Sequence, residues 1–397
     1  MTQSDNISSP PMKDQSVSSP NASLVFTPTF RRLLSLDALR GFDLFWIVGG
    51  SQLFPALFIL TGWAGWENCA GQMVHAKWHG FTAYDLIFPL FIFLSGVALG
   101  LAGKPKPTET AEERRKRYVR AFRRLSLLLI LGIVYNNAWG RGGPGSFSAI
   151  RYASVLGLIG TSWFVAAMLA WHVSWRTQLI VAAGLLLMYW GLVALVPVPG
   201  YGAGVLTPEG CLPAWIDQHF LPGSRYLNQP YDPQGWLTIL TGAVNAILGL
   251  LAGQWLASNR CSPTQKAAWL ALSGICLLGL GWLWNPLLPV NKEIWTSSFV
   301  LVTSGVSAML LAAFYGIIDV AGWRWFGWPM AVIGANAILI YLAGALIKWD
   351  YTVQSLLGGI IRNLPAEWQP LLQTLGLLAI QWVLLWWLYR RKIFLRV

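Results

Sequence analysis

Charged side chains are scarce in this sequence. Asp, Glu, Lys and Arg make up 11% of its 397 residues, whereas soluble domains contain about 25%. Hydrophobic residues make up 55%, and they form successive runs of the roughly 20 apolar residues that a membrane helix needs. The composition excludes an ordinary soluble domain, and we expect an all-α, polytopic transmembrane helical bundle.

Cysteines and known catalytic signatures are also scarce. Four cysteines are too few for a disulfide scaffold, although one bridge between Cys69 and Cys211 is left open, because we place both in loops on the same side. The sequence contains no P-loop, no GxGxxG after a strand and no serine nucleophile elbow. Composition alone therefore leaves a transporter or a membrane enzyme.

Ten stretches are expected to span the membrane. Lys and Arg favour the segments on one side of this arrangement by about three to one, which by the positive-inside rule is the cytoplasmic side. Both termini are then expected in the cytoplasm. The expected spans are 36–60, 82–101, 122–138, 153–171, 179–196, 236–257, 267–284, 297–320, 331–347 and 371–389.

The first 30 residues differ from the rest of the chain. They are rich in Ser, Pro and Asn and contain no long apolar run, which is typical of a disordered cytoplasmic tail and not of a signal peptide. Residues 31–397 are expected to form one transmembrane domain. The net charge is +12, and the basic residues cluster in alternate short loops. The expected partners are therefore membrane lipids and an anionic cofactor, and not nucleic acid.

One stretch joins a polar half to an apolar half. It reads His75-Ala-Lys-Trp-His79-Gly-Phe-Thr-Ala-Tyr-Asp85 and then enters a long apolar run. An ionisable residue inside an apolar segment is costly and usually has a partner or a function. We predict that His75 is catalytic, because an imidazole pKa of about 6.5 suits proton transfer at neutral pH. The alternative is an interfacial histidine that only bonds to solvent.

A metal site is not expected at these histidines. His75 and His79 are four residues apart, which on a helix could place two ligands together, and Glu67 and Cys69 lie close by. However, no third His or Cys follows at the interval that is typical of zinc sites.

Two groups of charged residues lie at the cytoplasmic ends of expected spans. Asp37, Arg40 and Asp43 are three apart, so a helix places them on one face. They form either a buried ion pair or, through Arg40, a phosphate site, since arginine binds phosphate in a forked geometry. Arg123 and Arg124 begin the third expected span and could reach a pocket at the membrane face, whereas the basic loop before them could simply set the topology.

Several motifs together resemble the heparan-α-glucosaminide N-acetyltransferase family. The resemblance covers roughly residues 31–397 in order, including loops, which are more specific than apolar spans. The matching stretches are Arg32-Leu-Leu-Ser-Leu-Asp37-Ala-Leu-Arg40-Gly41, His75-Ala-Lys-Trp78-His-Gly80, Asp85-Leu-Ile-Phe-Pro89, 197–200, 231–235, 289–295, 336–341 and 388–394.

The resemblance implies an activity and a site. Members of the family take acetyl-CoA from the cytosolic side and acetylate the free amine of a glucosamine across the membrane. Their active-site histidine falls on His75 and the following carboxylate on Asp85. Their early Asp falls on Asp37. Arg40 and Arg124 match the basic positions that we expect to bind the phosphates of acetyl-CoA, and no metal is expected.

The acceptor side shows departures from the family. A polar Asn of the lysosomal enzyme becomes Ser51, and the Asn after its Trp becomes His79; with Asn336, these residues are our candidates for binding an amino-sugar or glycan acceptor. The match is to the bacterial branch, which implies a multi-pass protein of a bacterial inner membrane, and we expect a homodimer. We favour direct transfer over an acetyl-histidine intermediate. The alternative function is an amino-sugar transporter with a polar site that includes Asp43, Asn245 and Asn336.

Overall fold

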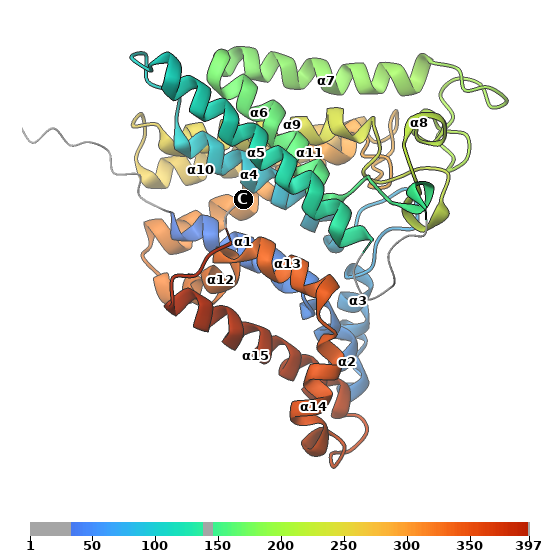
Figure 1. Ribbon diagram of the computed structural model, residues 1–397, viewed down its shortest axis with the longest axis vertical. Helices are drawn as coiled ribbons and strands as arrows, with labels where there is room; N and C mark the ends of the chain where they lie inside the picture. The colour runs from blue at the N-terminus through green and yellow to red at the C-terminus, as the bar shows by residue number, and fades with distance from the viewer. Residues whose placement is uncertain (1–32, 138–145, 396–397) are drawn as a thin grey trace, which may run out of the picture. The chain divides into compact units, whose positions relative to one another are not determined.

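A computed structural model describes residues 33–137 and 146–395, and every regular element within these ranges is helical (Figure 1). The expected tail 1–30 lies outside the described residues, as do Arg31, Arg32 and Arg141. The elements are α1 Leu34–Ile47, η1 Gly50–Gln52, α2 Leu53–Thr61, α3 Ala64–Gln72, η2 Ala83–Leu86, α4 Ile87–Ala102, α5 Ala111–Asn136, η3 Phe147–Ala149, α6 Val155–His172, α7 Trp175–Leu195, α8 Leu212–Phe220, η4 Tyr226–Asn228, α9 Thr238–Ala257, α10 Pro263–Trp284, α11 Ser297–Phe314, η5 Tyr315–Val320, α12 Arg324–Ala335, α13 Ala337–Leu346, α14 Trp349–Ile361 and α15 Gln369–Arg390.

The all-α prediction is confirmed, and the chain is a multi-pass membrane protein by the character of its helices. Among the described residues, seven helices are long and apolar enough to cross a membrane, or up to nine if each of two bent pairs counts as one span. The expected span 122–138 falls mainly in α5, which is not among these nine and begins with a charged segment. The number of ten spans and the side of each terminus stay predictions.

Two bent helix pairs cross each other. The segment Leu34–Ile47 bends by 58° into Gly50–Thr61, and Arg324–Ala335 bends by 57° into Ala337–Leu346. Gly49 has φ 136° at the first bend, a conformation that glycine adopts readily. At the crossing, a Cβ on Gly41 would lie 1.7 Å from the Met330 carbonyl oxygen. The backbones of α1 and α12 therefore touch.

The helices fall into two groups in Figure 1. α1, α2, α12, α13, α14 and α15 lie together and are called the first group, and α4 to α11 form the second group. The largest apolar core lies in the second group, among α4, α6, α9 and α11. α1 packs against α4 and α11, and α13 contacts α5, so these three contacts join the two groups.

Glycines and one asparagine hold α4 against α9. Gly96 and Gly100 on α4 and Gly249 and Gly253 on α9 form two GxxxG patterns, which let helices approach closely in membranes. A Cβ on Gly249 would lie 2.0 Å from the Phe93 carbonyl oxygen.

Asn245 lies in the same interface and is fully buried. Its Nδ2 donates to the Pro89 carbonyl at 2.7 Å, and its Oδ1 accepts from Ser304 Oγ at 2.7 Å. Asn245 therefore joins α4, α9 and α11. Cys69 and Cys211, for which a bridge was left open, are both free thiols.

The glycine contact predicts a stability difference. Gly249→Ala should lower the thermal unfolding midpoint of the purified protein, because overpacking costs about 1–3 kcal/mol. The matched control is Gly279→Ala on α10, where a Cβ meets nothing within 4 Å; this change should be neutral or slightly stabilising, since Ala favours helix over Gly. Equal midpoints for the two variants would contradict the packing described.

Candidate active site

His75 and Asp85 form a hydrogen-bonded pair where the chain enters α4. The chain leaves α3 at Gln72, passes through an irregular loop and returns to the bundle at η2. His75 Nδ1 lies 2.7 Å from Asp85 Oδ1. Because an ionised carboxylate only accepts hydrogen bonds, we assign the proton to Nδ1, which leaves the lone pair of the neutral ring on Nε2. The structure thus brings these two predicted residues together.

Three further donors satisfy the Asp85 carboxylate. Its Oδ2 accepts from Thr82 N and Thr82 Oγ1, both at 3.0 Å, and from Ala76 N at 3.4 Å. Thr82 caps η2 reciprocally, so the same bonds start the helix. Asp85 is 1% exposed, whereas the His75 side chain is 42% exposed. A buried, anchored carboxylate therefore orients an accessible imidazole, which is the arrangement of a general base.

A polar cavity lies beside this pair. The Tyr84 ring is 4.8 Å from the His75 ring and lines a cavity of about 580 Å³, which also contains the predicted residue Ser51 in its wall. Hydroxyl, amide and aromatic side chains give the cavity its character. The lining residues are Ile47, Val48, Gly49, Ser51, Gln52, Tyr84, Tyr135, Ile340, Tyr341, Gly344, Ile347, Lys348, Trp349, Asp350, Tyr351, Leu377 and Gln381.

His79 lies on another side of the loop. Its Nδ1 is 3.3 Å from Asn291 Nδ2, and its ring packs on Trp78 at 5.8 Å between centroids. Burial lowers the pKa of His79, so the ring is neutral at neutral pH. The two histidines therefore have different partners: His79 contacts Asn291 and Trp78, whereas His75 contacts Asp85 and Tyr84.

Asn336 occupies the second helix bend. Its Nδ2 donates to the Ile393 carbonyl at 3.0 Å, and its Oδ1 accepts from Leu395 N at 3.0 Å. The side chain is fully buried and ties the break between α12 and α13 to the C-terminal segment. The structure does not bring Asn336 to the cavity wall that contains Ser51.

The loop between α7 and α9, called the cap, packs beside the His75 loop. Trp78 Nε1 donates to the Leu206 carbonyl at 2.7 Å. Arg151 forks onto Asp232 at 3.0 and 2.8 Å. Asp217 on α8 accepts the backbone N–H of Asp232 at 3.0 Å, and burial raises the pKa of Asp217 to about 6. The Trp78 bond joins the cap to the His75 loop. The Arg151 bonds join the cap to the segment before α6, and the Asp217 bond lies within the cap.

A basic cavity lies beside the middle of α5. It has a volume of about 440 Å³ and is lined by Arg117, Arg120, Ala121, Arg123, Arg124, Leu127, Trp163 and Trp171. The Arg124 guanidinium lies 4.2 Å from the Trp163 ring centroid, and its Nε is buried without a hydrogen-bond partner among the described residues. Such an arginine can accept an anionic ligand without first breaking an ion pair at that atom.

Arg40 and Arg124 lie close enough to repel each other electrostatically, so the structure brings these two predicted residues together from α1 and α5. Arg40 Nη1 is also 3.7 Å from Asp37 Oδ1, as the ion-pair alternative proposed. Trp163 and Trp171 were not predicted as site residues from the sequence. The basic face of α5 could have been, because Arg117, Arg120 and Arg124 are spaced by three and four residues.

α5 connects the basic cavity with the polar one. Arg124 and Tyr135 are eleven residues apart on this helix, which at 1.5 Å per residue is about 16 Å. Tyr135 lines the polar cavity and stacks on Tyr341 at 4.4 Å. A small apolar cavity shares Ile47 and Tyr341 with the polar one.

The described residues contain no group of three or more His, Cys, Asp or Glu side chains that could hold a metal ion.

Comparison with known proteins gives two relatives. The chain is 27% identical to human heparan-alpha-glucosaminide N-acetyltransferase and 26% identical to the mouse protein of the same name, in each case over 418 residues. The match covers 92% of this chain and 60% of each relative, so the chain spans about three-fifths of the length of the curated relatives it matches. No protein-family model matches the chain.

The buried Asp217 predicts a pH dependence of stability. Its carboxyl ionises near the ordinary value of 3.8 when unfolded and near 6 when folded, so the folded state holds a proton that the unfolded state has released. Stability should therefore fall as the pH rises from about 4 to about 6, by on the order of 3 kcal/mol at 1.36 kcal/mol per unit. The measurement is the unfolding midpoint of the purified protein between pH 4 and 7.5.

Asp217→Asn should remove this component of the pH dependence. Glu209→Gln, a change at an exposed carboxylate of the same cap, should keep it. A wild-type pH profile in Asp217→Asn would contradict the assignment.

Proposed function

We propose, from the distant family relationship of this chain to the heparan-alpha-glucosaminide N-acetyltransferases, that it is a membrane-bound acetyltransferase. It moves an acetyl group from cytoplasmic acetyl-CoA to the amine, or a hydroxyl, of an amino sugar or glycan on the periplasmic side of a bacterial inner membrane. The observation that carries the proposal is the His75–Asp85 pair, in which a buried carboxylate orients an accessible imidazole beside a polar cavity.

The pair supports a direct transfer. The acceptor nitrogen attacks the thioester carbonyl carbon, and His75 Nε2 takes the proton that the nitrogen loses. The carbon–sulfur bond then breaks, and CoA leaves as a thiolate that is protonated afterwards. Asp85 stays ionised and stabilises the imidazolium that forms, as the carboxylate of a catalytic triad does. An imidazole is also a nucleophile, so an acetyl-histidine intermediate is the alternative route.

The basic cavity supports donor binding from the cytoplasm. Acetyl-CoA is a polyanion, and Arg124 on α5 lies within electrostatic reach of Arg40 on α1, in the part of the bundle that the positive-inside rule predicts to be cytoplasmic. Bound there through its phosphates, the donor has about 16 Å of α5 between Arg124 and Tyr135 along which to extend. The acceptor then occupies the polar cavity, where aromatic rings and Ser51 offer stacking and hydrogen bonds to a sugar.

An amino-sugar transporter is the second candidate, and the two bent helix pairs favour it. Broken helices are a feature of many transporter binding sites, and here two of them cross at Gly41. Asp43 adds a carboxylate that is 1% exposed and whose Oδ2 has no partner among the described residues. Asn245 and Asn336, in contrast, are engaged in contacts between helices and with the C-terminal segment.

The central test is transfer of label from acetyl-CoA to glucosamine by the purified protein. His75→Ala should lower the rate by about 100- to 10,000-fold, the usual effect of losing a general base, and leave donor binding intact. His79→Ala is the control, because His79 contacts Asn291 and Trp78 and not the Asp85 carboxylate, and it should lose much less. Similar rates for the two variants would refute the assignment, and uptake of unmodified sugar into vesicles without acetyl transfer would establish the transporter.

Donor binding provides a separate test. Arg124→Ala should weaken acetyl-CoA binding about 10- to 150-fold, because a hydrogen bond to a charged group contributes about 1.5–3 kcal/mol. The control is Arg176→Ala, which removes an exposed cation at the start of α7. This segment follows His172, whose Nε2 lies 2.6 Å from Tyr118 Oη on α5. If Arg124→Ala and Arg176→Ala bind acetyl-CoA equally well, the basic cavity is not the donor site.

A further inference from the structure

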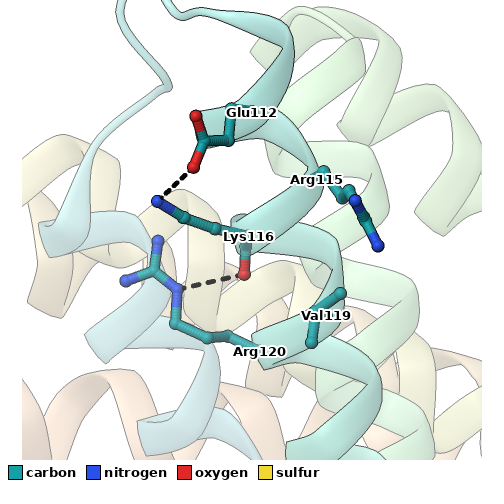
Figure 2. A pocket seen from close by; sticks show the side chains of 5 residues that line it. All are labelled: Glu112, Arg115, Lys116, Val119 and Arg120. Atoms are coloured by element: carbon teal, nitrogen blue, oxygen red, sulfur yellow. Dashed lines mark hydrogen bonds and ion pairs between the residues drawn. The ribbon is translucent and has the colours of Figure 1, made fainter.

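A second basic surface lies on α5, next to the cavity assigned to the donor. It is a groove of about 440 Å³, lined by Glu112, Arg115, Lys116, Val119 and Arg120 and called here the α5 groove. Figure 2 shows these side chains on successive turns of one helix. Only Arg120 also lines the basic cavity described above, so the groove has its own set of side chains.

The α5 groove carries an excess of positive charge. Three of its side chains are cationic and one is anionic. Lys116 Nζ lies 2.6 Å from Glu112 Oε1, but the two side chains are 67% and 74% exposed, and an ion pair in water contributes little. Figure 2 shows Arg115 apart from this pair. The groove therefore offers several N–H donors to an anion.

The neighbouring Arg117 is paired with a carboxylate. Its Nε and Nη2 donate to the two oxygens of Glu109 at 2.9 and 2.7 Å, and its side chain is 15% exposed. Arg120 Nε, in contrast, donates to the Lys116 carbonyl at 3.2 Å. The cations of the groove are thus not neutralised in the way that Arg117 is.

An apolar surface begins within the groove and continues along the helix. Val119, Phe122 and Ile130 are 56%, 55% and 56% exposed. Counted from Arg115, each residue follows the one before it by four, three and eight positions, so all four lie on one side of α5. Large apolar side chains exposed on a membrane protein face hydrocarbon. The groove therefore lies at the boundary where lipid head groups meet acyl chains.

We propose that the α5 groove binds the head group of an anionic phospholipid. Arg115, Lys116 and Arg120 donate to the phosphate oxygens, and Val119 and Phe122 contact the upper part of the acyl chains. Charge complementarity and the position at the polar–apolar boundary carry this assignment. The phosphates of acetyl-CoA offer the same chemistry, and the experiment separates the two sources.

The probe is phosphatidylglycerol, and its binding to the detergent-purified full chain is measured by native mass spectrometry. Arg115→Gln with Lys116→Gln should weaken binding about 30-fold, which is about 2 kcal/mol at 1.4 kcal/mol per tenfold. Each basic residue near an anionic lipid surface contributes about half of that. Zwitterionic phosphatidylcholine should bind equally weakly to both proteins.

The matched control is Arg176→Gln with Arg260→Gln, which removes two exposed cations elsewhere and should bind phosphatidylglycerol as the wild type does. Equal losses in the two double variants would show a general charge effect and overturn the site. Unchanged binding in the first variant would also overturn it. Displacement of the lipid by acetyl-CoA, together with weaker acetyl-CoA binding in that variant, would assign the groove to the donor.

Discussion

A buried carboxylate, Asp85, determines how the rest of the site is arranged. An ionised group that is 1% exposed at the entrance of an apolar helix is unfavourable unless its oxygens are satisfied. Here the preceding loop supplies the donors. The backbone N–H groups of Thr82 and Ala76 donate to Asp85 Oδ2, and His75 Nδ1 donates to Asp85 Oδ1, which orients the imidazole. The shape of the loop, the entry of α4 and the direction of the imidazole are thus consequences of one desolvated charge.

α5 relates this site to the opposite end of the bundle. Arg124, whose Nε has no hydrogen-bond partner among the described residues, lies midway along the helix, and Tyr135 in the wall of the polar cavity lies at its C-terminal end. The basic part of the helix starts at Ala111, so its first turns extend beyond the expected span 122–138. The same helix therefore carries both surfaces that we propose to bind phosphate groups. The basic cavity would take the phosphates of acetyl-CoA, and the α5 groove would take a lipid head group.

Much of the fold and part of the site could be predicted from the sequence. Apolar runs specify membrane helices because no other element leaves its backbone satisfied in lipid. The family motifs selected His75, Asp85, Arg40 and Arg124 as site residues, and the structure places His75 Nδ1 2.7 Å from Asp85 Oδ1. The roles of the four residues stay predictions. The bends could not be predicted, because Gly49 and Asn336 act through backbone geometry and tertiary contacts. His79 was an acceptor-binding candidate from its position after Trp78 in the family motif, and this role stays a prediction. Residues 74–82 are not helical, so the four-residue spacing of His75 and His79 does not place the two rings on one helix face.

The two candidate functions differ in what they require of the contact between the helix groups. Ser51 belongs to the first group, whereas His75 and Tyr84 lie in the loop that leads into the second. That loop is attached to the second group, because Gly80 N donates to the Val290 carbonyl at 2.8 Å. The polar cavity therefore lies between the two groups. The touching backbones at Gly41 and Met330 make the bent pairs one block, so a transporter would have to move this block against α4 and α11. Acyl transfer needs the opposite, a fixed distance between the imidazole and an acceptor held across the same boundary.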